Sequence, residues 1–348
     1  MAAKLPKQPT LRTISELSGL AIPTVSRALN NAPDIGAKTK SRVHQIARDI
    51  GYVPNRAGLR LRTGKTNVIS LVLGTDNEVT DHTGQLVSSI ARALRDTRYH
   101  MIVTPYFPQE DPLRPVRYIV ETRSADAVIL NRIETVDARI DYLTERGFPF
   151  VTYGRTDACA GQPFFDFDNM SFGRIAAQTL IRAGRRRIAL LAPPLQQSYA
   201  QHMLTGAQAV LNGAGLSLDV IAGINSDDAG HVLRDGVAGY LGRMPQTDGL
   251  ICPSTTAAIA AVVGCERQGR VIGETVDVFA KEAIPFLEYF RPQLKSVIED
   301  VAEAGTFLAR AAIQAIEQPD LPPLQRLVEA KPIGDPTGYT NTGQQSHR

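Results

Sequence analysis

The sequence predicts two structural classes in one chain, an all-α helix-turn-helix head and an α/β body of two parallel-sheet lobes. Three observations support this division. Apolar residues recur at helical spacing up to residue 50. From residue 67 onward, short apolar strands alternate with amphipathic helices. The 348 residues are also too many for one ordinary core, so we expect several domains.

The head, residues 8–53, should contain three helices. Thr10 is a suitable N-cap for the first helix, which Gly19 ends. The second helix should begin at Ile22-Pro23, because proline is tolerated at a first helical position, and residues 30–33 end it. The inward-facing positions of the three helices are Leu11, Ile14, Leu17, Val25, Ala28, Leu29, Val43, Ile46, Ala47 and Ile50. Three short helices with a tight turn between the first two form a helix-turn-helix.

The charge of the chain is unevenly distributed. Residues 1–66 carry a net charge of +9, whereas the remainder carries −6. A basic head on an acidic body indicates binding to a polyanion such as DNA, although a basic face that merely aids solubility is the alternative.

The second helix should enter the major groove with its N-terminal residues against the base edges. Arg27 suits guanine, because its guanidinium can pair with O6 and N7 together, while Ile22 and Pro23 offer only apolar contact. The short polar side chains suited to phosphates are Thr24, Ser26 and Asn30. A solvated helix face is the alternative for each of these residues.

Residues 54–66 form a hinge that is too short to be a stable helix alone in water. Leu61 stands between Arg60 and Arg62 on this segment, which has little core to join. The leucine either wedges between base steps in the minor groove, with the arginines on phosphates, or packs on the body.

The body should have one lobe formed by residues 67–157 and 299–322 and another formed by residues 158–298 and 323–335. The predicted strands are 68–73, 100–104, 126–130, 149–153, 188–192, 248–252, 276–280 and 296–298, with one more after Leu324. The predicted helices between them include 85–95, 171–183, 205–214 and 302–316. Ligands of such folds bind at the carboxyl ends of the strands.

Residues 11–30 resemble the head of the LacI/GalR repressor family, above all in the Thr-Val-Ser-Arg-x-Leu-Asn core, and Gly51-Tyr52-x-Pro54-Asn55 matches as well. The resemblance implies a periplasmic-binding-protein-like body and a homodimer on a pseudo-palindromic operator in double-stranded DNA. It also implies hinge helices side by side in the minor groove, with Leu61 as the wedge. The further expected DNA contacts are Thr10, Leu11, Tyr52, Asn55, Arg56 and Gly58. The sequence departs from the family at Ala21, often a serine, and at the hinge glycine, because glycine is costly in a helix.

A cleft between the lobes should bind a small-molecule effector, which the family suggests is a sugar or sugar derivative. Carboxylates and amides would pair with hydroxyl groups while aromatic rings cover the apolar face. The expected effector-binding residues are Asp76, Tyr153, Arg155, Phe165, Asp168, Gln197, Tyr199, His202, Met203, Ser254 and Glu282. The family's sugar-binding arginine falls at Met203, so His202 and Arg155 are the alternative donors.

Other functions find little support. The sequence has no G-x-S-x-G elbow, P-loop or H-E-x-x-H motif, so we expect no enzyme activity. Its three cysteines have no metal-ligand spacing, and we expect neither a metal nor a cofactor. No apolar run spans a membrane, no signal peptide is evident, and the cytoplasm is the expected compartment. A sugar- or solute-binding protein without a DNA role is the alternative. No leucine heptad follows Leu327, which favours a dimer over a tetramer.

Overall fold

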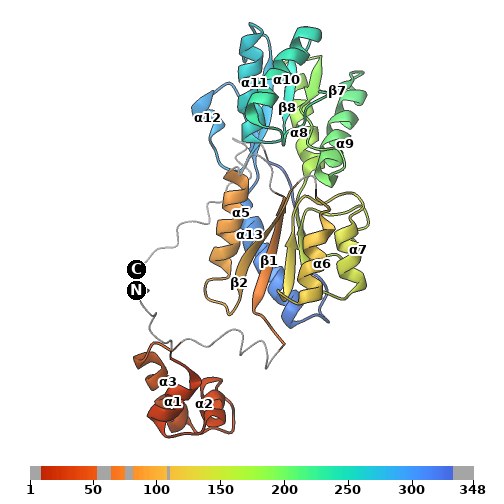
Figure 1. Cartoon of the computed structure of the whole chain (residues 1–348). Coiled ribbons are helices and arrows are strands. Elements are labelled where there is room, and N and C mark those ends of the chain that lie inside the picture. Colours follow the sequence, from red (N-terminus) through yellow and green to blue (C-terminus); the bar gives the residue numbers. More distant parts are fainter. Residues whose placement is uncertain (1–8, 53–63, 75–80, 108–109, 332–348) are drawn as a thin grey trace. The chain divides into compact units, whose positions relative to one another are not determined.

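The computed structural model describes residues 9–52, 64–74, 81–107 and 110–331. The chain divides into two compact units, Met1–Thr66 and Asn67–Arg348, which we call the head and the body. Figure 1 shows the helices of the head and the alternating strands and helices of the body. Among the described residues, no helix is long and apolar enough to cross a membrane.

The head contains three helices, α1 (Leu11–Ser18), α2 (Ile22–Leu29) and α3 (Ala37–Asp49). The Thr10 side chain accepts a hydrogen bond from the Thr13 amide, and the Thr13 side chain accepts one from the Thr10 amide. Gly19 ends α1 with a positive φ of 69°, a conformation that glycine adopts without steric cost. These helix limits confirm the predicted caps. The buried core residues of the head are Ile14, Val25, Ala28, Val43 and Ala47.

The first lobe is built on a six-stranded parallel sheet with the order β11-β5-β4-β3-β1-β2. Its strands are β1 (Val68–Gly74), β2 (His100–Tyr106), β3 (Ala127–Leu130), β4 (Phe150–Tyr153), β5 (Phe164–Phe167) and β11 (Gln325–Val328). Its helices are α5 (Asp81–Ala93), α6 (Leu113–Thr122), α7 (Ala138–Glu145) and α13 (Val301–Glu317). Successive side chains of a strand point to opposite faces. Accordingly, Ile69 and Leu71 pack with α5 and α13, whereas Val72 packs with α6 and α7. Figure 1 shows these two pairs of helices on opposite sides of the sheet.

The second lobe is built on a five-stranded parallel sheet with the order β10-β9-β8-β6-β7. Its strands are β6 (Ile188–Leu190), β7 (Leu218–Val220), β8 (Gly249–Cys252), β9 (Asp277–Glu282) and β10 (Lys295–Ile298). Its helices are α8 (Asn169–Arg182), α9 (Ser198–Gly213), α10 (Gly230–Arg243), α11 (Thr255–Arg267) and the short α12 (Leu287–Phe290). Two parallel sheets with helices on their faces confirm the predicted fold class.

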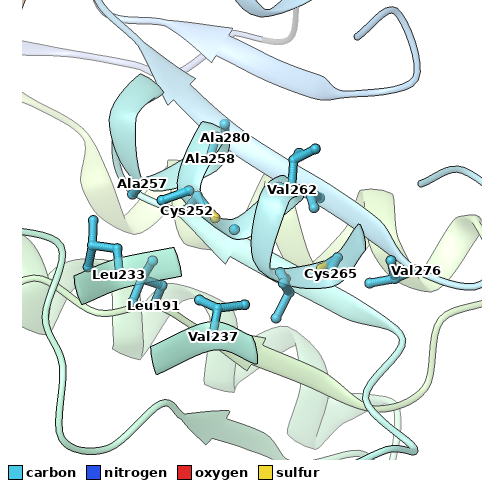
Figure 2. Close-up of a cluster of buried hydrophobic side chains, with 14 of the residues drawn as sticks. Leu191, Leu233, Val237, Cys252, Ala257, Ala258, Val262, Cys265, Val276 and Ala280 are labelled. Carbon is cyan, nitrogen blue, oxygen red and sulfur yellow. The ribbon is translucent and has the colours of Figure 1, made fainter. Parts of the chain in front are cut away.

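An apolar core lies between the second sheet and the helices α10 and α11. Figure 2 shows Leu233 and Val237 of α10 together with Val262 of α11 in this cluster. Cys252 and Cys265 are buried in the same core, and their burial raises the pKa of both thiols. Both cysteines therefore act here as small apolar residues rather than as nucleophiles.

The predicted division of the body into lobes requires a correction. Residues 158–298 and 323–335, which include β5 and β11, were expected to form the second lobe, and of these two strands only the one after Leu324 was predicted. Instead they pair with each other, from Phe164 opposite Gln325 to Phe167 opposite Val328, and β5 joins the first sheet through β4. A local pattern that predicts a strand carries no information about which sheet that strand joins.

Candidate functional site

The exposed side of α2 carries most of the residues expected to contact DNA. Ile22, Pro23, Arg27 and Asn30 are exposed, and Thr24 and Ser26 are half-buried, because Val25 and Ala28 on the opposite side fill the head core. Thr10 is exposed at the start of α1. Leu11 and Tyr52 are half-buried and pack against the same core. Asn55, Arg56, Gly58 and Leu61 lie outside the described residues.

Arg27 has an acidic neighbour that the sequence analysis did not assign to the site. Its guanidinium forms an ion pair with the carboxylate of Asp34, and the Arg27 and Asp34 side chains are 58% and 45% exposed. The turn that carries Asp34 begins at Asn31, which has a positive φ of 56° and whose Oδ1 lies 3.2 Å from Nε2 of His44. Asp34 is one of few acidic residues in a strongly basic head, and this feature of the sequence could have identified it as a neighbour of the DNA-binding residues.

The body contains a cavity of about 440 Å³ at the carboxyl ends of strands from both sheets. Residues at or just after β1, β3, β4 and β5 line it from the first lobe, and residues after β7 and β8 line it from the second. The polar side chains of its wall include His82, Asn131, Arg132, Tyr153, Asp166, Asn169, Ser198, Tyr199, Asp227, Ser254, Lys281, Glu282 and Glu299. The rule that ligands of such folds bind at the carboxyl ends of the strands, which we call the strand-end rule, therefore located the cavity from the sequence.

Glu299 lies at the centre of a buried network in the cavity wall. Its carboxylate lies 2.6 Å from Nζ of Lys281 and 3.8 Å from Nε2 of His82, and it accepts a hydrogen bond from the hydroxyl of Tyr153. Burial alone would raise the pKa of Glu299, but Lys281 and His82 lower it well below its usual value. Glu299 is therefore a carboxylate anion. Burial and Glu299 raise the pKa of Tyr153, so its hydroxyl stays protonated as a donor.

The aromatic and amide groups around Lys281 hold its ammonium group in place. Nζ lies 3.2 Å from Oδ1 of Asn169, and it lies over the rings of Phe167 and Tyr199 at 5.1 and 5.7 Å from their centroids. A cation over an aromatic face is attracted by the negative face of the ring. Lys281 is thus fixed between Glu299 and two rings.

Glu282 and Asp166 are acidic residues of the wall with different surroundings. Glu282 accepts hydrogen bonds from the amides of Phe286 and Leu287 and from the Ser296 hydroxyl, so its contacts hold the loop before α12. Asp166 lies 3.3 Å from the guanidinium of Arg155. Burial nevertheless raises the pKa of Asp166 to about 7, although the charge of Arg155 opposes this shift.

Nine of the eleven expected effector residues divide into three groups. Tyr153, Tyr199, Ser254 and Glu282 line the cavity, whereas Asp76 lies outside the described residues. Four others are near the cavity without lining it, and they are Arg155, Asp168, Gln197 and His202. Asp168 instead caps α8 by accepting from the Ser171 amide.

The expectations for Phe165 and Met203 are corrected. Both side chains are buried in hydrophobic cores, Phe165 beneath α13 and Met203 between α8 and the second sheet. Phe165 lies on β5, and its neighbour Asp166 points into the cavity instead, because adjacent strand residues face opposite ways. Met203 lies where α9 packs closely against α8, since a Cβ on Gly173 would lie 2.2 Å from the Met203 carbonyl oxygen.

The sequence analysis missed several lining residues. They are His82, Asn131, Asp166, Asn169, Asp227, Lys281 and Glu299. Glu299 and Lys281 directly follow predicted strands, so the strand-end rule applied strictly would have found both. Asp166 and Asp227 depend on β5 and β7, which are too short for a periodicity to reveal.

A helix-turn-helix head joined to a two-lobed body with a polar cavity defines a DNA-binding regulator with a ligand-binding domain. Comparison with known proteins identifies the family. Residues 10–55 match the family described as bacterial regulatory proteins, lacI family, and residues 67–306 match periplasmic binding proteins and the sugar binding domain of the LacI family. The chain belongs to the LacI family of transcription regulators, as the resemblance predicted.

Individual relatives support the same assignment. The HTH-type transcriptional regulator AglR of Rhizobium meliloti is 32% identical, over 90% of this chain and 89% of its own. RafR of Escherichia coli, another HTH-type transcriptional regulator, is 31% identical, over 84% and 85%. Among solved structures, the lac repressor dimer bound to operator and an anti-inducer has a TM-score of 0.79 at 19% identity, covering 94% of this chain and 98% of that one. A complex of the regulator CelR with cellobiose has a TM-score of 0.68 at 24% identity and the same coverage.

Proposed function

We propose that this chain represses transcription as a homodimer on a pseudo-palindromic operator in the cytoplasm. A neutral sugar bound in the body cavity changes its affinity for that operator and is not chemically converted. The polar cavity at the strand ends of both lobes is the observation that carries this proposal. Its relatives are named as regulators, and structures of relatives contain an operator-bound dimer and a cellobiose complex, which supports it. The match of the head to the lacI family argues against a solute-binding protein without a DNA role.

The charges of the cavity wall favour a neutral ligand. Two of its described side chains are lysine or arginine, and each is paired with a carboxylate, Lys281 with Glu299 and Arg132 with Asp227. A phosphate group would therefore meet no uncompensated cation, and its burial would be costly. Hydroxyl groups can both donate to and accept from such pairs. The ring of Tyr199 lies in the same wall and can cover the apolar face of a sugar.

The two lobes offer a route from the ligand to the DNA. A ligand that contacts both lobes shifts the population toward one arrangement of them. In the proposed dimer this arrangement sets the spacing of the two hinge segments, residues 54–66, and hence how well both heads reach their half-sites.

A thermal-shift screen tests the ligand class. Glucose, galactose, cellobiose, melibiose and raffinose are added to the full chain beside glucose 6-phosphate, and operator binding is then measured with any sugar that stabilises the protein. We expect a neutral sugar to raise the melting temperature, because a ligand that binds only the folded state stabilises it, and to change operator affinity. Stabilisation by the phosphate alone, or by no compound, would contradict the proposal.

The variant Leu61→Ala tests the DNA-binding mode. If Leu61 is a wedge between base steps, its loss should weaken operator binding by at least tenfold while non-specific binding changes little, because only the operator complex is kinked. The matched control is Leu59→Ala, which removes a leucine from the same segment. Equal losses on both DNAs would refute the wedge, and a monomer in gel filtration would refute the homodimer.

A further inference from the structure

Arg132 and Asp227 face each other across the cavity from different lobes. Arg132 follows β3 of the first sheet and Asp227 follows β7 of the second, and the Arg132 Nη2 atom lies 3.1 Å from Oδ2 of Asp227. The two side chains are 27% and 18% exposed, and both residues line the cavity. The pair therefore connects the lobes at a place where a ligand can touch both partners.

The backbone at Arg132 is strained, and a buried pair holds it in that state. Arg132 has a positive φ of 54°, a conformation that is strained for an L-residue and is concentrated at functional sites. The buried guanidinium of Arg139 donates to the Arg132 carbonyl at 2.9 Å and is itself paired with the buried Asp137. This support fixes the direction in which the Arg132 side chain leaves the backbone.

The loop that carries Asp227 is equally well defined. The Asp227 amide donates to Oδ1 of Asn225 at 3.0 Å, and the Asn225 amide donates to Oδ2 of Asp228 at 2.8 Å. The Ser226 amide donates to the carbonyl of Ala192, just after β6. Both members of the pair are thus placed by their own lobes before any ligand binds, which lowers the entropy cost of binding.

Unsatisfied polar atoms gather beside this pair. Among the residues that the structure describes, Oδ1 of Asn131, Oγ of Ser198 and Oδ2 of Asp227 are buried without a hydrogen-bond partner, although the last is ion-paired with Arg132. Asn131 and Ser198 line the cavity, and the Ser198 amide donates to the Ile133 carbonyl at 2.8 Å, which ties the start of α9 to this segment. Buried polar atoms are nearly always hydrogen-bonded, so the unpartnered Asn131 and Ser198 oxygens beside this ion pair indicate a ligand rich in hydroxyl groups.

Other basic side chains near the cavity are less suited to this role. Arg155 is paired with Asp166 and His202 lies beside it, and neither residue lines the cavity. Lys281 lines the cavity, but its ammonium is enclosed by Glu299 and two rings. Met203, on α9, is buried in a core.

We propose that Arg132 and Asp227 form a clamp for neighbouring hydroxyl groups of the effector sugar, with Arg132 as the guanidinium that recognises it. One hydroxyl accepts from Arg132 and donates to Asp227, and its neighbour donates to Asn131 and accepts from Ser198. The inference rests on the proposed function of the cavity as a sugar site. Because the clamp joins the lobes, the same contacts transmit ligand binding to their arrangement.

Calorimetric titration of the full chain with the most stabilising sugar of the panel tests the clamp. We expect Arg132→Gln and Asp227→Asn to weaken sugar binding by about tenfold to a hundredfold, since each removes a buried hydrogen bond to a charged group. Arg132→Lys should also weaken it, because lysine keeps the charge but not the planar fork. The control Arg98→Gln removes an arginine from an exposed pair with Glu317, away from the residues that line the cavity, and should bind as the wild type does. Unchanged binding by the Arg132 variants, or a larger loss in the control, would overturn the clamp.

A second measurement needs no sugar. Without ligand, Arg132→Gln should speed hydrogen exchange at residues 225–228, because their tie to the first lobe is lost, whereas Arg155→Gln should not. Unchanged exchange there would overturn the connection between the lobes. If the proposed function itself were wrong, the wild-type chain would bind no sugar of the panel. This outcome is distinct from failure of the clamp, in which the wild type binds a sugar and the Arg132 variants bind it equally well.

Discussion

One ion pair of the head and one of the body cavity lie in opposite surroundings. The head pair Arg12–Glu16 has side chains that are 80% and 68% exposed, whereas the body pair Lys281–Glu299 has side chains that are 12% and 4% exposed. Charges in water interact weakly and remain available to an external partner such as a phosphate backbone. Buried charges depend on each other instead, and a wall of balanced pairs suits an uncharged ligand.

The packing of the two units differs in the same way. The head encloses its few core residues with three short helices, and its glycines at residues 19, 36 and 51 have open space where a Cβ would be. In the body, α8 and α9 approach so closely that a Cβ on Gly206 would lie 2.1 Å from the carbonyl oxygen of Met170. The contact between α8 and α9 therefore admits no added atom unless the helices shift.

Loss of a buried charge should give the largest effect. Lys281→Met leaves Glu299 ionised without its main partner, and we expect the body to lose about 3–5 kcal/mol in its free energy of unfolding. Arg12→Met in the head should cost less than about 1 kcal/mol. Urea denaturation of both variants measures the difference. Similar losses of stability in both variants would contradict the contrast between the two pairs. A double variant, Lys281→Met with Glu299→Gln, should recover part of the lost stability, because it no longer holds an unpaired buried carboxylate.

Tight helix packing gives the next effect. Gly206→Ala should destabilise the body by about 1–3 kcal/mol, because α8 and α9 must separate to admit the methyl group. Gly213→Ala, at the end of the same helix and with no atom within 4 Å of its Cβ, is the matched control and should be neutral or slightly stabilising. Calorimetric unfolding distinguishes the two. A neutral Gly206→Ala would show that the helices have room.

The pH dependence of the body tests the environment of Asp166. Burial raises the pKa of this carboxyl from 3.8 to about 7, so the folded state holds its proton over a range in which the unfolded state has lost it. Between these two pKa values the unfolded state binds fewer protons than the folded state. The stability that the Asp166 carboxyl contributes therefore falls as the pH rises from about 4 to about 7. Urea unfolding at several pH values should show that Asp166→Asn lacks this decline. If the free energy of unfolding of the wild type rose over that pH range relative to that of Asp166→Asn, the result would contradict the burial of Asp166.

The smallest effect is expected at the exposed pair of the head. Asp34→Asn frees Arg27 from its carboxylate, so binding to non-specific DNA should strengthen a few-fold. The slope of the binding constant against salt concentration should steepen by the amount expected for about one more phosphate contact. Glu16→Gln removes the same charge from a pair with Arg12 and is the control. Fluorescence anisotropy over a range of salt concentrations measures both. An identical response in the two variants would show that Asp34 acts only through net charge.

Local patterns predicted most of the elements. Thr10 and Gly19 bound α1 as expected, because capping depends on residues within one turn. The longer strands agree with their apolar runs, whereas β7, with three half-buried residues, has no run to detect. In the cavity, Tyr153 and Ser254 were predicted from their places at strand ends, but the same rule gave no indication that Arg155 would turn toward Asp166.

The sequence by itself determined the helix-turn-helix, the family and most of the strands and helices of the body, since these depend on periodicity and on short motifs. Only the tertiary structure decided which sheet β5 and β11 join, and which side chains meet in the cavity. Lys281 and Glu299 lie at the ends of neighbouring strands of the second sheet, whereas His82 belongs to α5 of the first lobe, so the contact of His82 with Glu299 depends on how the two lobes are brought together. Arg132 and Asp227 illustrate the same point, because long-range contacts are set by packing and not by any local pattern.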